Sequence, residues 1–161
     1  MKRITRFTAA LALGLGLAAS VQAAPPRLPT QPVLNLAAAQ HVLAAAQAKA
    51  QASGWPCVIA VADAAGQPIL LLRMDNAAVP AGVELAPGKA RTAALFRRPS
   101  GALEDAINGK RPAAATARGF VLMRGGLPLT VDGQVVGAIG VSADTPQHDE
   151  EIAQAGVAAL Q

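Results

Sequence analysis

The chain contains one cysteine, no tyrosine and few aromatic residues, which make up 2% of its 161 residues. A single cysteine excludes a scaffold held together by internal disulfides and a zinc site built from several thiolates. Charged residues are also scarce, at 15%, whereas hydrophobic residues make up 52%. This composition and length predict one packed domain, because disordered chains lack the apolar surface that drives burial.

The common enzyme signatures are absent as well. The sequence holds no Gly-x-Ser-x-Gly nucleophile elbow, no glycine-rich phosphate loop followed by Lys-Ser/Thr and no His-Glu-x-x-His zinc motif. Only two histidines, His41 and His148, are available for metal binding or acid–base chemistry. These absences favour a binding protein over an enzyme.

Residues 1–23 have the pattern of a secretory signal peptide. Three basic residues precede an apolar stretch, residues 7–21, and small residues at Val21 and Ala23 suit signal peptidase. The stretch has about 15 residues, fewer than the about 20 that span a bilayer, so stable membrane insertion is not expected. We predict cleavage near Ala23 and a periplasmic or secreted protein.

Removal of residues 1–23 changes the charge of the chain. The full sequence has 14 basic and 10 acidic residues, and the first 23 contain three of the basic ones, which leaves 11 against 10. Nucleic-acid binding is therefore not expected, because it needs a clustered basic surplus. The closest to clusters are Arg97-Arg98 and Lys110-Arg111, which we interpret as solvated loop charges.

A proline-rich leader, residues 24–34, precedes the predicted domain, residues 35–161. Apolar residues at helical spacing predict a helix over Leu36–Ser53. Asn35 suits its N-cap and Gly54 its C-terminal stop.

Four short apolar runs predict strands in two β-hairpins. They are Cys57–Ala62, Pro68–Arg73, Leu127–Val131 and Gln134–Ser142, the last two joined by Asp132-Gly133. Asp-Gly between apolar runs is a strong hairpin signal. Glycines inside the last strand, Gly137 and Gly140, indicate that another segment packs close to its backbone.

Further helices are expected after the first hairpin and at the C-terminus. A helix over Glu84–Phe96 should begin or kink at Pro87, and Ser100 should cap a short helix over residues 100–107. Residues 108–119 are expected to form a surface excursion. Thr145 should cap the last helix, with Asp149, Glu150 and Glu151 complementing its dipole. Hairpins with helices packed on them define an α+β domain.

Several polar residues could contact a ligand. His41 lies at the edge of the first helix's apolar stripe, where it is either a packed residue or an iron ligand of a cofactor. Lys89 and Thr92 share one helix face, and with Arg73 they suit an anionic group such as a heme propionate or a small carboxylate. Solvated helix charge is the alternative for Lys89. Cys57 is interpreted as a small buried residue.

Three ordered segments resemble the GlcG/HbpS family of heme-binding proteins and the C-terminal module of PduO-type cobalamin adenosyltransferases. The segments contain Lys89-Ala90-x-Thr92-Ala93, Gly125-Gly126-x-Pro128-Leu129 and Gly137-Ala138-Ile139-Gly140-Val141-Ser142. The resemblance covers residues 35–160. It implies a profilin-like α+β fold with a five-stranded antiparallel sheet, and a homo-oligomer.

The resemblance also implies a ligand. The leading hypothesis is an exported, non-catalytic protein that binds heme, with a corrinoid as a less favoured cofactor. In it Arg73 or Lys89 meets the propionates, and His41, which would also be the metal ligand, or Thr92 lies near the iron. The alternative is a small-carboxylate-binding protein or enzyme of glycolate-type metabolism. The chain departs from the family pattern at Asn76, where glycine is usual, at Gly82, where a small hydroxyl residue is usual, and at Pro87-Gly88.

Overall fold

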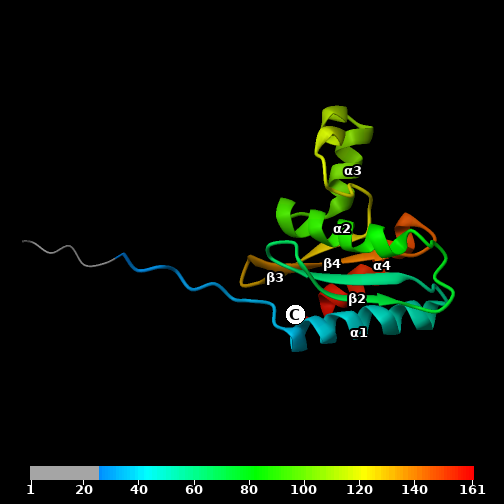
Figure 1. Cartoon of the computed structure of the whole chain (residues 1–161), viewed down its shortest axis with the longest axis horizontal. Coiled ribbons are helices and arrows are strands. Elements are labelled where there is room, and N and C mark those ends of the chain that lie inside the picture. The colour runs from blue at the N-terminus through cyan, green and yellow to red at the C-terminus, as the bar shows by residue number, and fades with distance from the viewer. Residues whose placement is uncertain (1–25) are drawn as a thin grey trace, which may run out of the picture. The chain divides into compact units, whose positions relative to one another are not determined.

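The computed structural model describes residues 26–161, so the predicted signal peptide lies outside the described residues. Residues 26–35 carry no helix or strand. Gln31–Gln161 form one compact unit (Figure 1). Its elements are α1 (Leu36–Ser53), β1 (Val58–Asp63), β2 (Pro68–Arg73), α2 (Gly82–Phe96), α3 (Ser100–Asn108), the 3-10 helix η1 (Pro112–Thr116), β3 (Gly126–Val131), β4 (Gln134–Ser142) and α4 (Pro146–Ala158). No helix in this part of the chain is long and apolar enough to cross a membrane.

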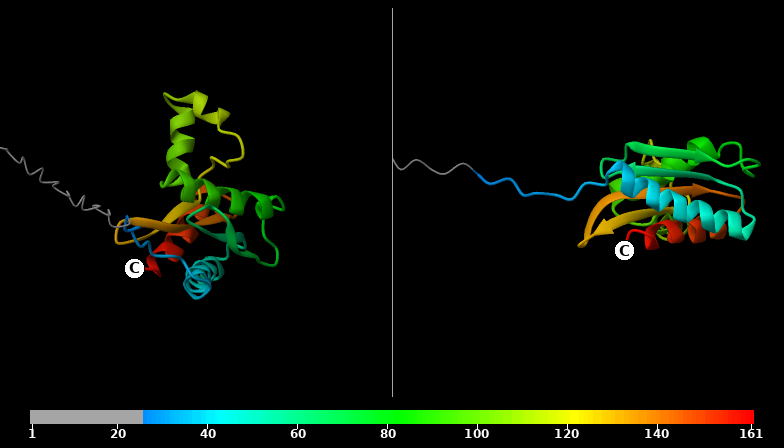
Figure 2. Two further views of the ribbon diagram at one scale, coloured as in Figure 1. Left: turned by 60° about the vertical axis from the view of Figure 1, so that its left-hand side comes forward. Right: turned by 90° about the horizontal axis from the view of Figure 1, so that it is seen from below.

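The four strands form one antiparallel sheet in the order β2-β1-β4-β3. The α+β class is confirmed, but the described residues hold four strands and not the expected five. The fifth strand was implied only by the family resemblance, whereas the apolar runs themselves supply two hairpins. Helices α1 and α4 cover one face of the sheet and α2 covers the other (Figures 1 and 2).

Strand β1 shows why both faces are covered. Its residues are almost all buried, and successive side chains point to opposite faces. Ile59 and Val61 join the large core cluster formed with α1 and α4, whereas Val58 and Ala60 pack with Ala86 of α2. A strand whose first five residues are all apolar and buried therefore lies between two layers of helices.

Local capping residues set the ends of α1 as predicted. The side chain of Asn35 accepts a hydrogen bond from the backbone N–H of Ala38 at 2.9 Å. Gly54 has φ of 68° and its N–H bonds back to the last turn of the helix. The Asp132-Gly133 turn is also confirmed, with positive φ at both residues.

Of the two expectations for Pro87, a helix start or a kink, helix α2 contradicts the start. It begins at Gly82, before Pro87, and Pro87 lies inside it. The helix lies very close to the sheet, because a Cβ on Gly140 would collide with the backbone of Ala86 and Ala90. The predicted close packing at Gly140 is confirmed, and Gly137 is likewise crowded by the backbone of Ala62.

Residues 97–118, comprising α3, η1 and the links around them, form an arm that projects from the body on the α2 side (Figure 2). The expected surface excursion of residues 108–119 is its outer half. Ser100 does not cap α3, since Pro99 holds the N-cap position. Its hydroxyl instead donates to the Met123 carbonyl at 2.6 Å and accepts from the Gly126 N–H at 2.8 Å, which ties the base of the arm to β3.

Candidate functional site

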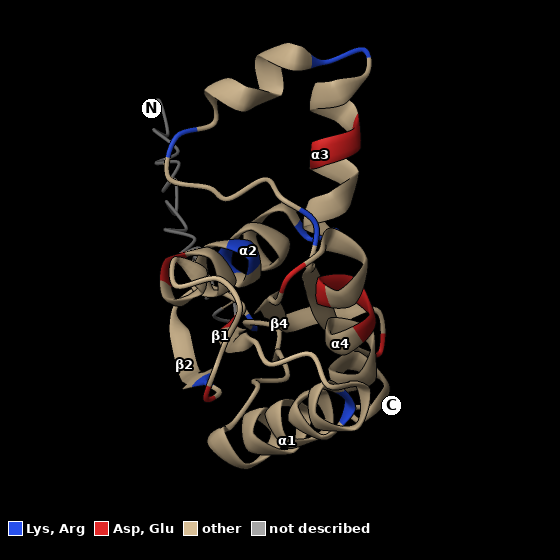
Figure 3. Ribbon diagram, turned by 90° about the vertical axis from the view of Figure 1, so that its right-hand side faces the viewer, with Lys and Arg blue, Asp and Glu red and all other residues tan. Residues whose placement is uncertain are grey.

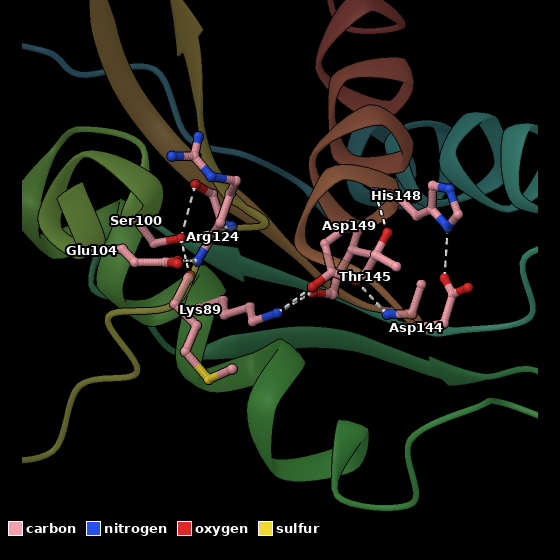
Figure 4. A network of polar contacts seen from close by, with 12 residues as sticks. Lys89, Ser100, Glu104, Arg124, Asp144, Thr145, His148 and Asp149 are labelled. Atoms are coloured by element: carbon pink, nitrogen blue, oxygen red, sulfur yellow. Dashed lines mark hydrogen bonds and ion pairs between the residues drawn. The ribbon is translucent and has the colours of Figure 1, made fainter. Parts of the chain in front are cut away.

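Lys89 is buried in the centre of the domain. Its side chain is 2% exposed, and its Nζ lies 2.6 Å from Oδ2 of Asp149 and 3.0 Å from the Val141 carbonyl oxygen (Figure 4). The ion pair joins α2 to α4 past the end of β4. The Lys89 ammonium, expected to meet a ligand carboxylate, is thus already held by a carboxylate of its own chain.

Asp149 is also buried and has a second hydrogen-bond partner besides Lys89. Its Oδ1 accepts a hydrogen bond from the Ala143 N–H at 2.5 Å. Burial raises the pKa of Asp149, and the bonds from Lys89 and Ala143 oppose that rise. The sequence placed this residue at the helix start as a dipole partner, whereas the structure uses it as a buried counter-ion. Nothing local predicts the pair, because the two residues are 60 positions apart.

Thr92 lies buried on the same face of α2 as Lys89. Its hydroxyl donates to the Gly88 carbonyl at 2.8 Å and accepts from the Val121 N–H at 3.1 Å. The predicted shared face of Lys89 and Thr92 therefore exists, but it packs against the sheet and a loop.

Arg73 lies apart from these two residues. It is exposed at the end of the edge strand β2 and borders a small cavity of about 200 Å³ with Met74 and Asn76. Arg73 pairs with Val58, which pairs with Ser142 on its other side, so it is two strands from β4. Asn76 has φ of 59°, a conformation that favours glycine and that asparagine tolerates, which explains the family's usual residue there.

His41 is exposed on α1, on the face of the sheet opposite to Lys89 and Thr92. The structure therefore does not bring the four predicted residues into one pocket of a single chain. His148 is engaged elsewhere: its ring stacks on Trp55 with centroids 3.6 Å apart, and Nδ1 lies 2.7 Å from Asp144. Hydrogen bonding from His148 lowers the pKa of Asp144.

Cys57 is a free, fully buried residue, as the sequence predicted. Its thiol donates to the sulfur of Met74 at 3.8 Å. Burial raises the pKa of the thiol to about 12, so the thiolate that would bind a metal or react is suppressed. Within residues 26–161, no three His, Cys, Asp or Glu side chains are placed to hold a metal ion.

Arg124 was not identified from the sequence, although it organises the base of the arm. Its guanidinium lies 2.8 Å from Glu150 of α4 and 2.9 Å from Asp105 of α3. Its backbone N–H donates to Glu104 at 2.5 Å. The hydrogen bonds to Glu150 and Asp105 keep the pKa of Arg124 above its ordinary value. Both acidic residues of the arm, Glu104 and Asp105, therefore bond to Arg124.

The arm also borders an open cavity of about 390 Å³. Its apolar walls come from Phe96, Leu103 and Leu122, and two guanidinium groups, Arg98 and Arg111, line it. These arginines belong to the two basic pairs interpreted as solvated loop charges. They are indeed exposed, and both border this cavity. Figure 3 shows basic segments at both ends of α3.

Comparison with known proteins relates this domain to proteins of two kinds. The family model "Haem degrading protein HbpS-like" matches residues 34–158. Protein GlcG of Escherichia coli is 42% identical over 113 residues, covering 70% of this chain and 84% of GlcG. The corrinoid adenosyltransferase PduO of Salmonella typhimurium is 33% identical over 123 residues, covering 72% of this chain and 35% of PduO.

Solved structures agree with these relatives. A double mutant of HbpS from Streptomyces reticuli is 32% identical, with a TM-score of 0.78 over 91% of this chain and 99% of HbpS. A complex of PduOC with heme is 29% identical, with a TM-score of 0.71 over 80% of this chain and 95% of PduOC.

The fold and the polar groups together define a small α+β domain with a buried Lys–Asp pair at its centre and a basic arm on one side. The chain belongs to the HbpS-like family, which confirms the resemblance to GlcG, HbpS and PduO.

Proposed function

We propose that this protein binds heme. The observation that carries the proposal is the match of the domain, over 80% of the chain, to the structure of a complex of PduOC with heme. The HbpS-like family description, which names haem, points the same way. A corrinoid is less favoured, because the corrinoid adenosyltransferase relative corresponds to this chain over only 35% of its own length.

The residues of this chain fit such a ligand in part. Heme is an apolar disc with two carboxylates and an iron that accepts an axial ligand. Of the two described histidines, His41 is the exposed one, so we propose it as the axial ligand. Iron held by His41 would lie outside the body of this chain, and in the homo-oligomer that we also propose it would lie at a contact between copies.

The small-carboxylate alternative is less favoured. It relied on Lys89 to hold and polarise the substrate, and that ammonium is buried against Asp149. Lys89 and Thr92 can affect binding through the packing of α2, and Arg73 remains an exposed cation for a propionate.

Hemin titration of the mature protein tests the function. We expect a saturable shift of the Soret band with a defined stoichiometry. His41→Ala should change the iron's spin state and weaken binding, and the exposed Gln40→Ala on the same helix is the matched control. An unchanged spectrum in His41→Ala would remove His41 as ligand, and no binding by the unmodified chain would remove the heme proposal.

Heme degradation is a second candidate function, because the matching family model names it. We propose binding without turnover, in line with the missing enzyme motifs. The hemin complex mixed with ascorbate distinguishes the two: a Soret band that persists as long as that of a heme–albumin control supports binding alone. A faster loss of the band that depends on the protein would establish degradation.

We further propose that the protein acts after export, with Ala24 as its mature N-terminus. N-terminal sequencing of the protein recovered outside the cytoplasm tests cleavage after Ala23. A retained Met1 would contradict export by this route. Light scattering of the same material tests the homo-oligomer, which a monomer mass at micromolar concentration would exclude.

A further inference from the structure

The arm carries positive charge that no acidic side chain of residues 26–161 pairs with. Five basic residues and two acidic residues lie within residues 97–118. Both acidic residues, Glu104 and Asp105, bond to Arg124 at the base. Among the described residues, no ion pair involves the five cations, which are Arg97, Arg98, Lys110, Arg111 and Arg118.

Two of these cations border the open cavity beside the arm. Arg98 precedes α3 and Arg111 follows it, so the 9-residue helix separates them in sequence while the cavity joins them. The remaining lining is apolar or small, with Phe96 at the end of α2 and Leu122 on the returning segment. Ligand sites commonly combine an apolar wall with a few placed polar groups in this way.

The chemistry of this lining selects a class of ligand. A guanidinium presents a planar fork that binds a carboxylate with two parallel hydrogen bonds. An aromatic ring and two leucines beside it suit a flat apolar body. The volume of about 390 Å³ lies near the lower end of the range for small-molecule sites, so the cavity would hold part of a tetrapyrrole and leave the rest outside.

We propose that the arm cavity holds the propionate-bearing edge of the tetrapyrrole, with Arg98 and Arg111 contacting its carboxylates. This inference rests on the proposed function and names the part of the chain that binds the propionates. Because the arm and His41 lie on opposite sides of the sheet, one tetrapyrrole would contact the arm of one copy and His41 of another copy in the proposed homo-oligomer. The cavity lining contains no imidazole or thiolate. Loss of its arginines should therefore weaken binding without changing the iron's ligands, in contrast to His41→Ala.

Two double variants with equal loss of charge test the proposal. Arg98→Gln with Arg111→Gln removes the cations that line the cavity. Arg97→Gln with Lys110→Gln removes two exposed neighbours that do not line it, and serves as the matched control. Each is titrated with hemin and with metal-free protoporphyrin IX, and circular dichroism establishes that all chains are folded.

We expect the cavity variant to bind both probes about tenfold more weakly or worse, which corresponds to about 1.4 kcal/mol, with the Soret position of its hemin complex unchanged. The control variant should stay within about twofold of the unmodified chain.

Equal weakening in both variants would mean general electrostatic attraction and would overturn the cavity as the site. Unchanged affinity in the cavity variant would overturn it as well, while leaving heme binding in place. If the unmodified chain binds no hemin, both the proposed function and this inference are removed.

Discussion

Charged residues gather in two parts of this molecule, and the two differ in what surrounds them. In the body, Lys89 and Asp149 are almost completely buried and satisfy one another. In the arm, Arg98 and Arg111 are exposed, border a cavity and have no acidic partner among the described residues. A buried charge that already has a partner stabilises the fold, whereas an exposed cation beside an apolar cavity is available to a ligand.

The largest effect is expected from breaking the buried pair. Lys89→Met leaves the Asp149 carboxylate buried with only the Ala143 N–H, and should lower the free energy of unfolding by about 3–5 kcal/mol. Denaturant unfolding measures the change. Lys89→Met combined with Asp149→Leu should recover much of the loss, because no unpaired charge remains. A single variant as stable as the unmodified chain would show that the pair contributes little.

The buried thiol of Cys57 should make the stability of the body depend on pH in the alkaline range. Its thiol has a pKa of about 12 in the folded protein against 9.0 as its ordinary value. Between these values the unfolded chain loses the proton and the folded chain keeps it, so stability falls as pH rises. The expected slope is about 1.4 kcal/mol for each pH unit above 9.

Unfolding by urea at pH 8, 9 and 10 measures this slope. In Cys57→Ala the free energy of unfolding should fall less steeply with pH, because no thiol remains to titrate. The same slope in both proteins would assign the alkaline loss to other groups.

The smallest effect on stability is expected in the arm. Arg98→Gln with Arg111→Gln should change the free energy of unfolding by no more than about 0.5 kcal/mol, because neither side chain is buried or ion-paired. Thermal unfolding without ligand provides the measurement. A loss comparable to that of Lys89→Met would erase the distinction between the two regions.

The sequence predicted those elements that depend on neighbouring residues. The helix over Leu36–Ser53 has its predicted bounds because Asn35 and Gly54 act within one turn of its ends. The Asp132-Gly133 turn is equally local. The start of α2 was predicted too late in the chain, because a local rule about proline does not include the packing of α2 against β4.

The candidate site depended on long-range contacts and was harder to predict. Lys89 was expected to meet a ligand carboxylate or to be a solvated helix charge, whereas it is buried against Asp149, 60 residues away. Ser100 was assigned to a cap, whereas its hydroxyl contacts a segment more than 20 residues further on. Arg98 and Arg111 look like ordinary loop charges in the sequence, and only the folded chain shows that both border one cavity.

The stacked pair of Trp55 and His148 has a practical consequence. Trp55 is the only tryptophan and the chain has no tyrosine, so its near-ultraviolet emission originates almost entirely at the corner between α1 and α4. Lys49 lies 5.0 Å from the same ring. A bound tetrapyrrole absorbs where tryptophan emits, so the efficiency of energy transfer measures how far the ligand lies from this corner. Energy transfer from Trp55 thus reports the distance between the ligand and the face of the sheet opposite α2.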